Sequence, residues 1–306
     1  MCFDGYEGCA PLSEEPYTYA RRFQNVIQSD QLERSGGVLS HASPNARVQD
    51  FTPHKQASMS DTVGQNPEIT EEAVRILEAA NAQGITLRLL GGLAVYLQSP
   101  SARTDERLKR SYKDLDFATL AKFGARTKVL FAELGYPGNK TFNALHGHQR
   151  LLFWDEQNGR QVDIFIDRFQ MCHNIDFRPR LQIDQRTLAL ADLLLTKLQI
   201  VEVNEKDLVD VVALFVDYDV GDDDRSINAA YIAKLMSNDW GFNKTLDLNL
   251  EKVKAFAVER HFPPYVAERI DALLARIQAQ SKSMGWKRRA MVGGRVRWYE
   301  LPEEPR

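Results

Sequence analysis

Hydrophobic residues recur at two different periods along the chain, and the pattern changes near residue 168. Before this point, segments with helical spacing alternate with short β-branched or alternating segments that are typical of strands. After it, helical spacing prevails up to about residue 281. The predicted helices cover residues 70–83, 93–97, 122–134, 187–203, 205–216, 227–237, 248–260 and 265–281, and the predicted strands cover 85–90, 114–120, 149–154 and 161–166.

This order of elements predicts an α+β fold, with a small mixed β-sheet flanked by helices and followed by a helical domain. We place the α/β domain at residues 67–175 and the helical domain at 176–285. Residues 1–66 are rich in Ser, Pro, Gln and Asn and lack a sustained period, which predicts a disordered or loosely attached leader. Gly293-Gly294 divides two short segments of residues 286–306 and predicts a basic, hairpin-like tail.

The composition is that of an ordinary globular protein and excludes several classes. The 306 residues carry a net charge of −3, so contact with nucleic acid would require a local basic patch. Three scattered cysteines without a CxxC spacing exclude a disulfide framework or a zinc site and favour the cytoplasm. We expect no membrane span and no signal peptide.

The candidate chemistry lies in three short segments of the α/β domain. Gly91 and Gly92 follow the first strand and open a helix, where free backbone amides can bind phosphate. Asp114 and Asp116 are two residues apart on a strand and share one face, and Asp163 follows on a later strand. Neighbouring carboxylates repel each other, and a magnesium ion with hard oxygen ligands removes that cost.

Each segment taken alone also has a simpler interpretation. An Asp-x-Asp pair is common at solvated strand ends, and Gly-Gly after a strand is commonly a turn. The three segments together, in this order and on these elements, favour a site for a metal and a nucleotide.

The same residues resemble a known superfamily. The segments Leu-Leu-Gly-Gly-Leu-Ala-Val-Tyr (89–96), Arg-Ser-Tyr-Lys-Asp-Leu-Asp-Phe (110–117) and Val-Asp-Ile-Phe (162–165) are similar to nucleotidyltransferases with the DNA polymerase β-type fold. The helical segments 191–199 and 206–210 resemble those of the group that contains AbiE-type toxins and lincosamide-type antibiotic nucleotidyltransferases. Leu93 and Tyr112 depart from that group's common residues.

The resemblance implies a role for each matching residue. It implies that Gly91 and Gly92 hold the triphosphate and that Asp114 and Asp116 bind Mg²⁺, with Mn²⁺ as the alternative. Asp163 would be a third metal ligand or the base for an acceptor hydroxyl. The remaining implied contacts are Lys197 on the nucleotide phosphates and Arg110 near the metal.

The implied activity is transfer of a nucleoside monophosphate from a nucleoside triphosphate such as ATP to an acceptor hydroxyl, with release of pyrophosphate. The acceptor stays open between RNA, a protein and a small molecule. A catalytically idle, nucleotide-binding interaction module of a toxin–antitoxin-like pair is the alternative from another class.

Several other residues keep two interpretations. Lys197 could instead extend to the surface, and Asp207 and Asp210 fit helix-surface or interdomain hydrogen bonding better than metal ligation. His146 and His148 lack further ligands for a metal, although His148 could touch a substrate.

The basic stretches 103–113 and 287–297 leave RNA binding and a solvated basic face open, with the aromatic residues of the second stretch packing on the helical domain in the latter case. Asp167 competes with Asp163, but its place at a strand end favours a cap or an ion pair.

Overall fold

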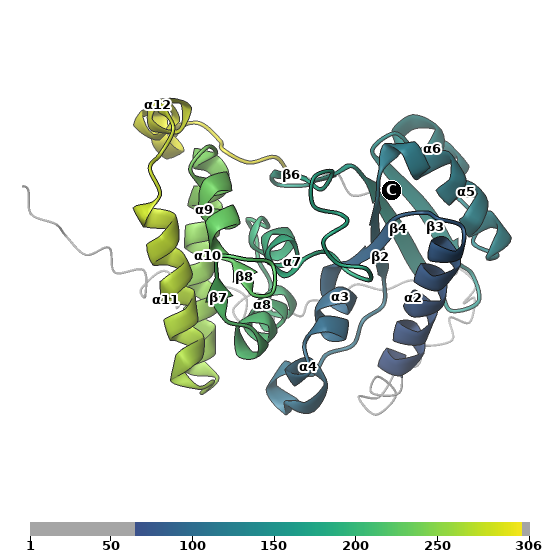
Figure 1. Ribbon diagram of the computed structural model, residues 1–306, viewed down its shortest axis with the longest axis horizontal. Helices are drawn as coiled ribbons and strands as arrows, with labels where there is room; N and C mark the ends of the chain where they lie inside the picture. Colours follow the sequence, from purple (N-terminus) through teal and green to yellow (C-terminus); the bar gives the residue numbers. More distant parts are fainter. Residues whose placement is uncertain (1–64, 302–306) are drawn as a thin grey trace, which may run out of the picture. The chain divides into compact units, whose positions relative to one another are not determined.

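The computed structural model describes residues 65–301 and has an α+β fold, as the periodicity predicts (Figure 1). Its main sheet has four strands in the order β1-β2-β4-β3. β1 and β2 are antiparallel, β2 and β4 are parallel, and β4 and β3 are antiparallel, so the sheet is mixed. The strands are β1 (Leu87–Leu90), β2 (Leu115–Thr119), β3 (Arg150–Asp155) and β4 (Arg160–Ile166).

One face of this sheet is the apolar core of the α/β part. Alternating strand residues turn Phe117 of β2 and Phe153 of β3 toward Phe131 of α5 (Gly124–Glu133). The Phe131 and Phe153 rings stack with centroids 4.8 Å apart. α2 (Gln65–Ala82) packs beside α5 and against β1. The opposite residues of β2 and β4, including Asp116 and Asp163, therefore lie on the other face.

Helix α3 (Gly91–Gln98) connects the sheet to the helical part of the chain. It follows β1 directly, and its Leu93, Ala94 and Val95 are buried. α3 packs against α7 (Leu190–Leu198) and α8 (Glu205–Asp217). The segment before α7 also pairs with β1, since the Leu188 amide donates to the Leu89 carbonyl. The sheet and the helices thus share a continuous hydrophobic core.

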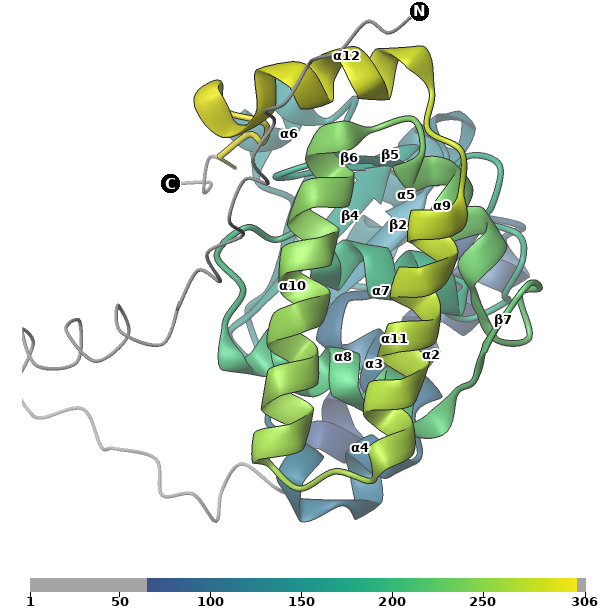
Figure 2. The ribbon, with the colours of Figure 1, turned by 90° about the vertical axis from the view of Figure 1, so that its left-hand side faces the viewer.

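The helical part is built from amphipathic helices with side-chain caps at several ends. Asn204 and Asp207 form a capping box at the start of α8. Figure 2 shows α10 and α11 side by side, with α12 across one end. The helices of this part beyond α8 are α9 (Ala229–Met236), α10 (Trp240–Glu259), α11 (Pro264–Ala279) and α12 (Met284–Val292).

The remaining elements are short. β5 (Arg168–Gln170) pairs with β6 (Asn174–Asp176), and β7 (Val220–Gly221) pairs with β8 (Ile227–Asn228). The others are α4 (Ser101–Thr104), α6 (Lys140–His146), η1 (Glu106–Leu108), η2 (Ala121–Phe123) and η3 (Gly293–Arg295).

The hairpin predicted for residues 286–306 is wrong for the described part of that segment. Residues 284–292 form α12, which Ser283 caps by accepting a hydrogen bond from the Trp286 amide. Gly293 has φ +61° and ends this helix. A glycine with positive φ serves a helix C-terminus as well as a turn, and the sequence pattern did not separate the two.

Two further elements differ from the expected boundaries. His146 lies outside every predicted helix, but the structure places it in α6, whose first turn is capped by Asn139. The predicted helix 187–203 is shortened to 190–198, because residues 186–188 are extended along β1. The leader predicted for residues 1–66 lies almost wholly outside the described residues. No helix between residues 65 and 301 is both long and apolar enough to cross a bilayer.

The aromatic residues near the C-terminus pack on α10. The Trp298 indole donates a hydrogen bond to the Thr245 hydroxyl at 3.0 Å, and its ring meets Trp240 edge to face. The Glu300 amide donates to the Cys172 carbonyl beside β5. This packing is the simpler of the two interpretations of the basic, aromatic tail.

We therefore expect Trp298→Ala to lower the free energy of unfolding by about 1–3 kcal/mol, because it removes a partly buried ring and its hydrogen bond. Met291→Ala is the matched control, since Met291 lies in the same segment and is 76% exposed. Urea denaturation followed by circular dichroism measures both. Equal stabilities of the two variants would contradict the packing role.

Candidate functional site

Two of the three predicted carboxylates are cross-strand neighbours. β2 and β4 run parallel with Asp116 paired to Asp163, and on the other side of β2 Asp116 pairs with Leu90, the last residue of β1. Cross-strand partners project from the same face of a sheet. Asp114 precedes β2 by one residue. The structure thus places Asp114 and Asp116 at the start of β2, with Asp163 beside Asp116 in the middle of β4.

We call Asp114, Asp116 and Asp163 the carboxylate row. Their surroundings disfavour the ionised form of Asp114 and Asp116. Burial, and then the neighbouring Asp163, raise the pKa of Asp116 to about 7, although the Lys197 charge opposes this shift. Partial burial, followed by Asp163, also raises the pKa of Asp114. Neither carboxylate has a hydrogen-bond or ion-pair partner within residues 65–301, although Lys113 and Lys206 exert weaker charge effects on Asp114. The pair is available to a cation.

Asp163 differs from the other two carboxylates because it is already paired. It is 3% exposed, and one of its oxygens accepts a hydrogen bond from Arg150 Nε of β3 at 2.7 Å. The other oxygen accepts from Gln161 Nε2 at 2.6 Å. Sequence reasoning missed Arg150 and Gln161. Only the strand register could have identified Arg150, since it lies on a neighbouring strand.

Gly91 and Gly92 leave room for charged side chains that a Cβ atom would displace. Gly91 has φ +73°, and a Cβ atom at this position would lie 2.4 Å from an Asp116 carboxylate oxygen. A Cβ atom on Gly92 would lie 1.9 Å from the Arg110 guanidinium. Leu90, the N-cap residue of α3, provides no side-chain cap, so the first amides of this helix remain available to an anion.

Lys197 and Arg110 belong to one charged network beneath α3. Lys197 Nζ lies 3.0 Å from Asp207 Oδ1 and 2.9 Å from Asp210 Oδ2, both on α8. Arg110 Nε lies 3.0 Å from Asp210 Oδ1, and its guanidinium stacks on the Tyr112 ring. Because the Lys197 side chain is only 12% exposed, it does not extend into solvent. It lies near enough to Asp116 for its charge to lower the pKa of that group.

The donor set fits a divalent cation only in part. The two unpaired carboxylates, Asp114 and Asp116, have the hard oxygen donors that magnesium prefers. Asp163 can join them only after one of its oxygens is released from Arg150 or shared with it. Within residues 65–301, no group of three or more His, Cys, Asp and Glu side chains is arranged to hold a metal ion.

The other candidate residues lie outside this row. His146 and His148 line a separate cleft, where His146 packs on Phe142. Asp167 directly follows β4, has φ +61° and accepts a hydrogen bond from the Ala121 amide, which is a capping role. In the stretch 103–113, Arg103 and Arg107 donate to backbone carbonyls of their own chain.

Comparisons with known proteins give little further information. No family model matches the chain, and no curated protein matches it. Among solved structures, it is similar to an antigenic nucleotidyltransferase-like protein from Paracoccidioides brasiliensis, with 14% identity and a TM-score of 0.35. That match covers 73% of this chain and 95% of the other. A similarity this low decides neither the fold nor the activity.

The raised pKa of Asp116 predicts a pH-dependent stability. The Asp116 carboxyl titrates near pH 3.9 in the unfolded chain and near pH 7 in the folded protein. Between about pH 4 and 7 the unfolded state has lost its proton while the folded state keeps it. The free energy of unfolding therefore falls as the pH rises through this range. Asp116→Asn removes this loss. At pH 8 we expect the variant to be more stable than the parent by on the order of 1–2 kcal/mol, and at pH 4 to be about equal.

Thermal melting between pH 4 and 8 in a chelator measures this difference. Asp223→Asn is the control, because Arg225 lowers the pKa of Asp223 and its replacement should bring no gain at pH 8. If the wild-type protein were as stable as Asp116→Asn at pH 8, the ionised Asp116 carboxylate would not destabilise the fold, and the prediction would be wrong.

Proposed function

We propose that the protein is a magnesium-dependent nucleotidyltransferase. The observation that carries the proposal is the carboxylate row, in which Asp116 and Asp163 are register partners and Asp114 lies just before β2. Three carboxylates here are costly without a cation. The site lies next to the uncapped start of α3, so a binding place for a metal and one for phosphate adjoin each other.

Different residues would bind the metal and the triphosphate. Asp114 and Asp116 hold the metal, with Mg²⁺ preferred and Mn²⁺ as the alternative, and the bound ion would neutralise charge on the phosphates. The Gly91 and Gly92 amides face the triphosphate, and the absence of Cβ atoms allows the close approach. Lys197 and Arg110 are held by Asp210 beside this position and supply positive charge to it.

In the proposed reaction the acceptor hydroxyl oxygen attacks the α-phosphorus of the triphosphate. The new oxygen–phosphorus bond forms as the bond between the α-phosphorus and the bridging oxygen breaks, and pyrophosphate leaves. Asp163 receives the hydroxyl proton, and Arg150 and Gln161 orient its carboxylate. Positioning and charge neutralisation supply most of the rate, as in phosphoryl transfer generally.

This function predicts that substitutions in the carboxylate row lower the transfer activity to different extents. We expect Asp114→Asn and Asp116→Asn to lower transfer on the order of 10³-fold or more, because each removes a charged metal ligand. Asp163→Asn should lower it by about 10²–10⁴-fold while triphosphate affinity changes little. Asp223→Asn is the control, because Asp223 pairs with Arg225 outside the row, and Asp167→Asn is measured beside it as the competing candidate for the third carboxylate.

The measurement is single-turnover transfer from each labelled triphosphate, with magnesium, to total RNA or to cell extract. Triphosphate affinity is measured in parallel by calorimetry. Near-wild-type transfer by Asp114→Asn and Asp116→Asn would overturn the site assignment. An inactive Asp167→Asn beside an active Asp163→Asn would reassign the third carboxylate.

One observation favours the idle, nucleotide-binding module instead. Arg150 neutralises Asp163 in the same way that a metal would, and a permanent ion pair would leave the row without its third ligand. In a transferase, Arg150 must release or share one Asp163 oxygen when the substrates and the metal bind. In an idle module, Arg150 is a fixed structural partner.

The two functions differ in how magnesium affects Arg150→Gln. Loss of one partner from a buried ion pair typically costs about 3–5 kcal/mol, so we expect this variant to melt well below the parent in a chelator. If the row binds magnesium, added Mg²⁺ should recover much of that loss and should raise the melting temperature of the parent less. A melting temperature that does not respond to Mg²⁺ in either protein would favour the idle module.

A further inference from the structure

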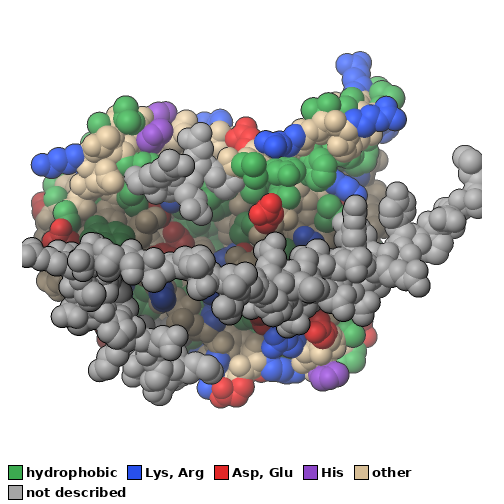
Figure 3. Space-filling view, turned by 180° about the vertical axis from the view of Figure 1, so that it is seen from behind, with side chains coloured by type: hydrophobic (Ala, Val, Ile, Leu, Met, Phe, Trp, Pro, Cys, Tyr) green, Lys and Arg blue, Asp and Glu red, His purple; other side chains and the backbone are tan. Residues whose placement is uncertain are grey.

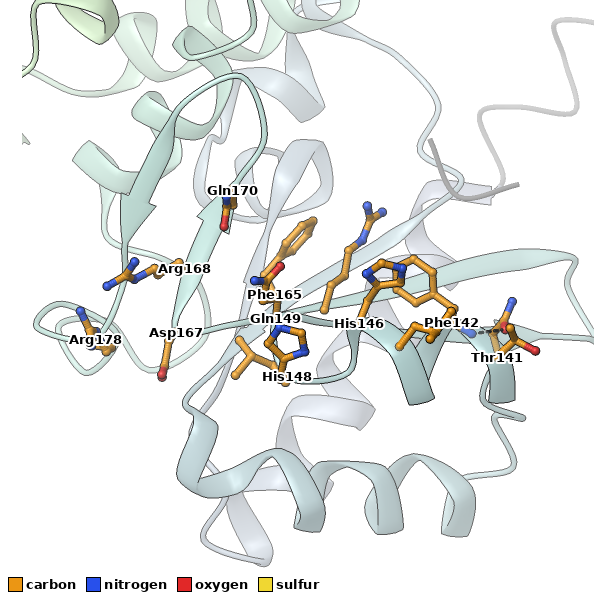
Figure 4. Close-up of a pocket in the computed structure, with 14 residues that line it drawn as sticks. Thr141, Phe142, His146, His148, Gln149, Phe165, Asp167, Arg168, Gln170 and Arg178 are labelled. Carbon is orange, nitrogen blue, oxygen red and sulfur yellow. Dashed lines mark hydrogen bonds between the residues drawn. The ribbon is translucent and has the colours of Figure 1, made fainter. Parts of the chain in front are cut away.

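A second feature of the same sheet face is an open cleft of about 1410 Å³ beside the carboxylate row. Figure 4 shows Phe142 and His146 of α6 on one side, Asp167, Arg168 and Arg178 on the other, and His148 between them. Ligand pockets for single small molecules typically occupy about 300–1,000 Å³. The cleft therefore has room for a ligand of at least nucleotide size.

The cleft carries more positive than negative charge. Arg168 is exposed and has no hydrogen-bond or ion-pair partner within residues 65–301. Arg178 forms a two-pronged pair with Asp176, and both side chains of this pair remain partly exposed. The acidic side chain in the lining is Asp167, which already accepts a backbone hydrogen bond. Exposed guanidinium groups in this arrangement suit phosphate oxygens.

The opposite wall offers an aromatic surface. The Phe142 and His146 rings lie with centroids 4.9 Å apart, and His146 is exposed. Phe165 of β4 forms part of the floor. Aromatic side chains beside basic groups are the arrangement on which nucleobases stack.

Arg150 joins the cleft to the carboxylate row. It lines the cleft, and its guanidinium carbon lies 5.0 Å from the Phe165 ring centroid. At the same time its Nε lies 2.7 Å from an Asp163 oxygen. A ligand that touches Arg150 from the cleft is thus separated from Asp163 by a single side chain.

We propose that this cleft is the acceptor site and that it takes an acceptor with nucleotide chemistry, a phosphate group together with an aromatic base. This inference rests on the proposed function, because it identifies the hydroxyl that attacks the triphosphate as one carried by the ligand of the cleft. Arg168 and Arg178 bind the phosphate, and Phe142 and His146 stack on the base. The ligand that carries the phosphate and the base is either a free mononucleotide or the end of an RNA strand.

The charge of the whole chain agrees with a local site of this kind. The net charge is −3, and on the visible part of the face in Figure 3 acidic and basic side chains are interspersed. General attraction to polyanions is therefore weak, and binding should depend on particular guanidinium groups.

The test uses the full chain with two probes, adenosine monophosphate and a fluorescein-labelled twelve-nucleotide oligoadenylate. Calorimetry and fluorescence anisotropy give the dissociation constants. We expect Arg168→Gln combined with Arg178→Gln to weaken binding of the preferred probe about tenfold. For the oligoadenylate it should also reduce the salt slope, which is the dependence of log Kd on log salt concentration, by about one to two. Phe142→Ala should weaken binding of the same probe with little change in that slope.

Arg225→Gln is the matched control, because Arg225 pairs with Asp223 two residues earlier, as Arg178 does with Asp176, but lies outside the cleft. It should bind as the wild type does. Tighter binding of the oligoadenylate identifies a strand end, and comparable or tighter binding of the monophosphate identifies a free nucleotide. If neither probe binds, or if the double variant binds as tightly as Arg225→Gln, the proposal is overturned.

Failure of this inference is distinguishable from failure of the proposed function. Loss of arginine-dependent probe binding, with label transfer to some other acceptor intact, rejects the cleft and leaves the transferase standing. Arginine-dependent probe binding without transfer from any triphosphate retains the cleft as a nucleotide site, rejects its role as an acceptor site and rejects the transferase.

Discussion

The structure of the site depends on the parallel pairing of β2 with β4, which forces Asp116 and Asp163 to be neighbours. Two carboxylates in this position repel each other, and burial adds to the cost of ionising them. The surrounding residues reduce this cost in different ways. Arg150 pairs with Asp163, and the Lys197 charge acts on Asp116 from the helical part. Apolar side chains at these positions would avoid this cost.

The charged network of α8 connects this row to the helices. Asp210 contacts Lys197 on one side and Arg110 on the other, and its side chain is only 1% exposed. Buried carboxylates require such partners, because an unpaired charge in the interior is strongly unfavourable. The same contacts set the position of Arg110 against Gly92. The helical part therefore contributes to the geometry at the start of α3 and does not only cover the sheet.

The sequence predicted the sheet and the carboxylate row well because both depend on simple periods. Residues two apart on a strand share a face, so the place of Asp116 on β2 and of Asp163 on β4 could be deduced without coordinates. The partners of Asp163 could not be deduced in this way. Arg150 reaches Asp163 from β3, and its position depends on a register that the hydrophobic pattern leaves open.

The other differences between the predicted and observed structure arise where a local sequence pattern fits two structures or where the outcome depends on packing. Gly293 fits both a hairpin turn and a helix end, and the Ser283 cap decides for the helix. Residues 140–146 belong to none of the predicted elements, and the Asn139 cap begins α6 there. Lys197 was expected on the phosphates from resemblance alone, and its ion pairs to α8 depend on packing between helices distant in the chain.

The close approach of Gly91 to Asp116 has a consequence for the divergence of related sequences. A side chain at position 91 and a carboxylate at position 116 compete for the same space, and the positive φ at 91 adds a backbone penalty. A relative that replaces this glycine is expected to shorten the residue at 116 or to shift the start of α3. The two positions should therefore covary, and the identity of residue 91 would distinguish relatives that keep the carboxylate row from those that have lost it.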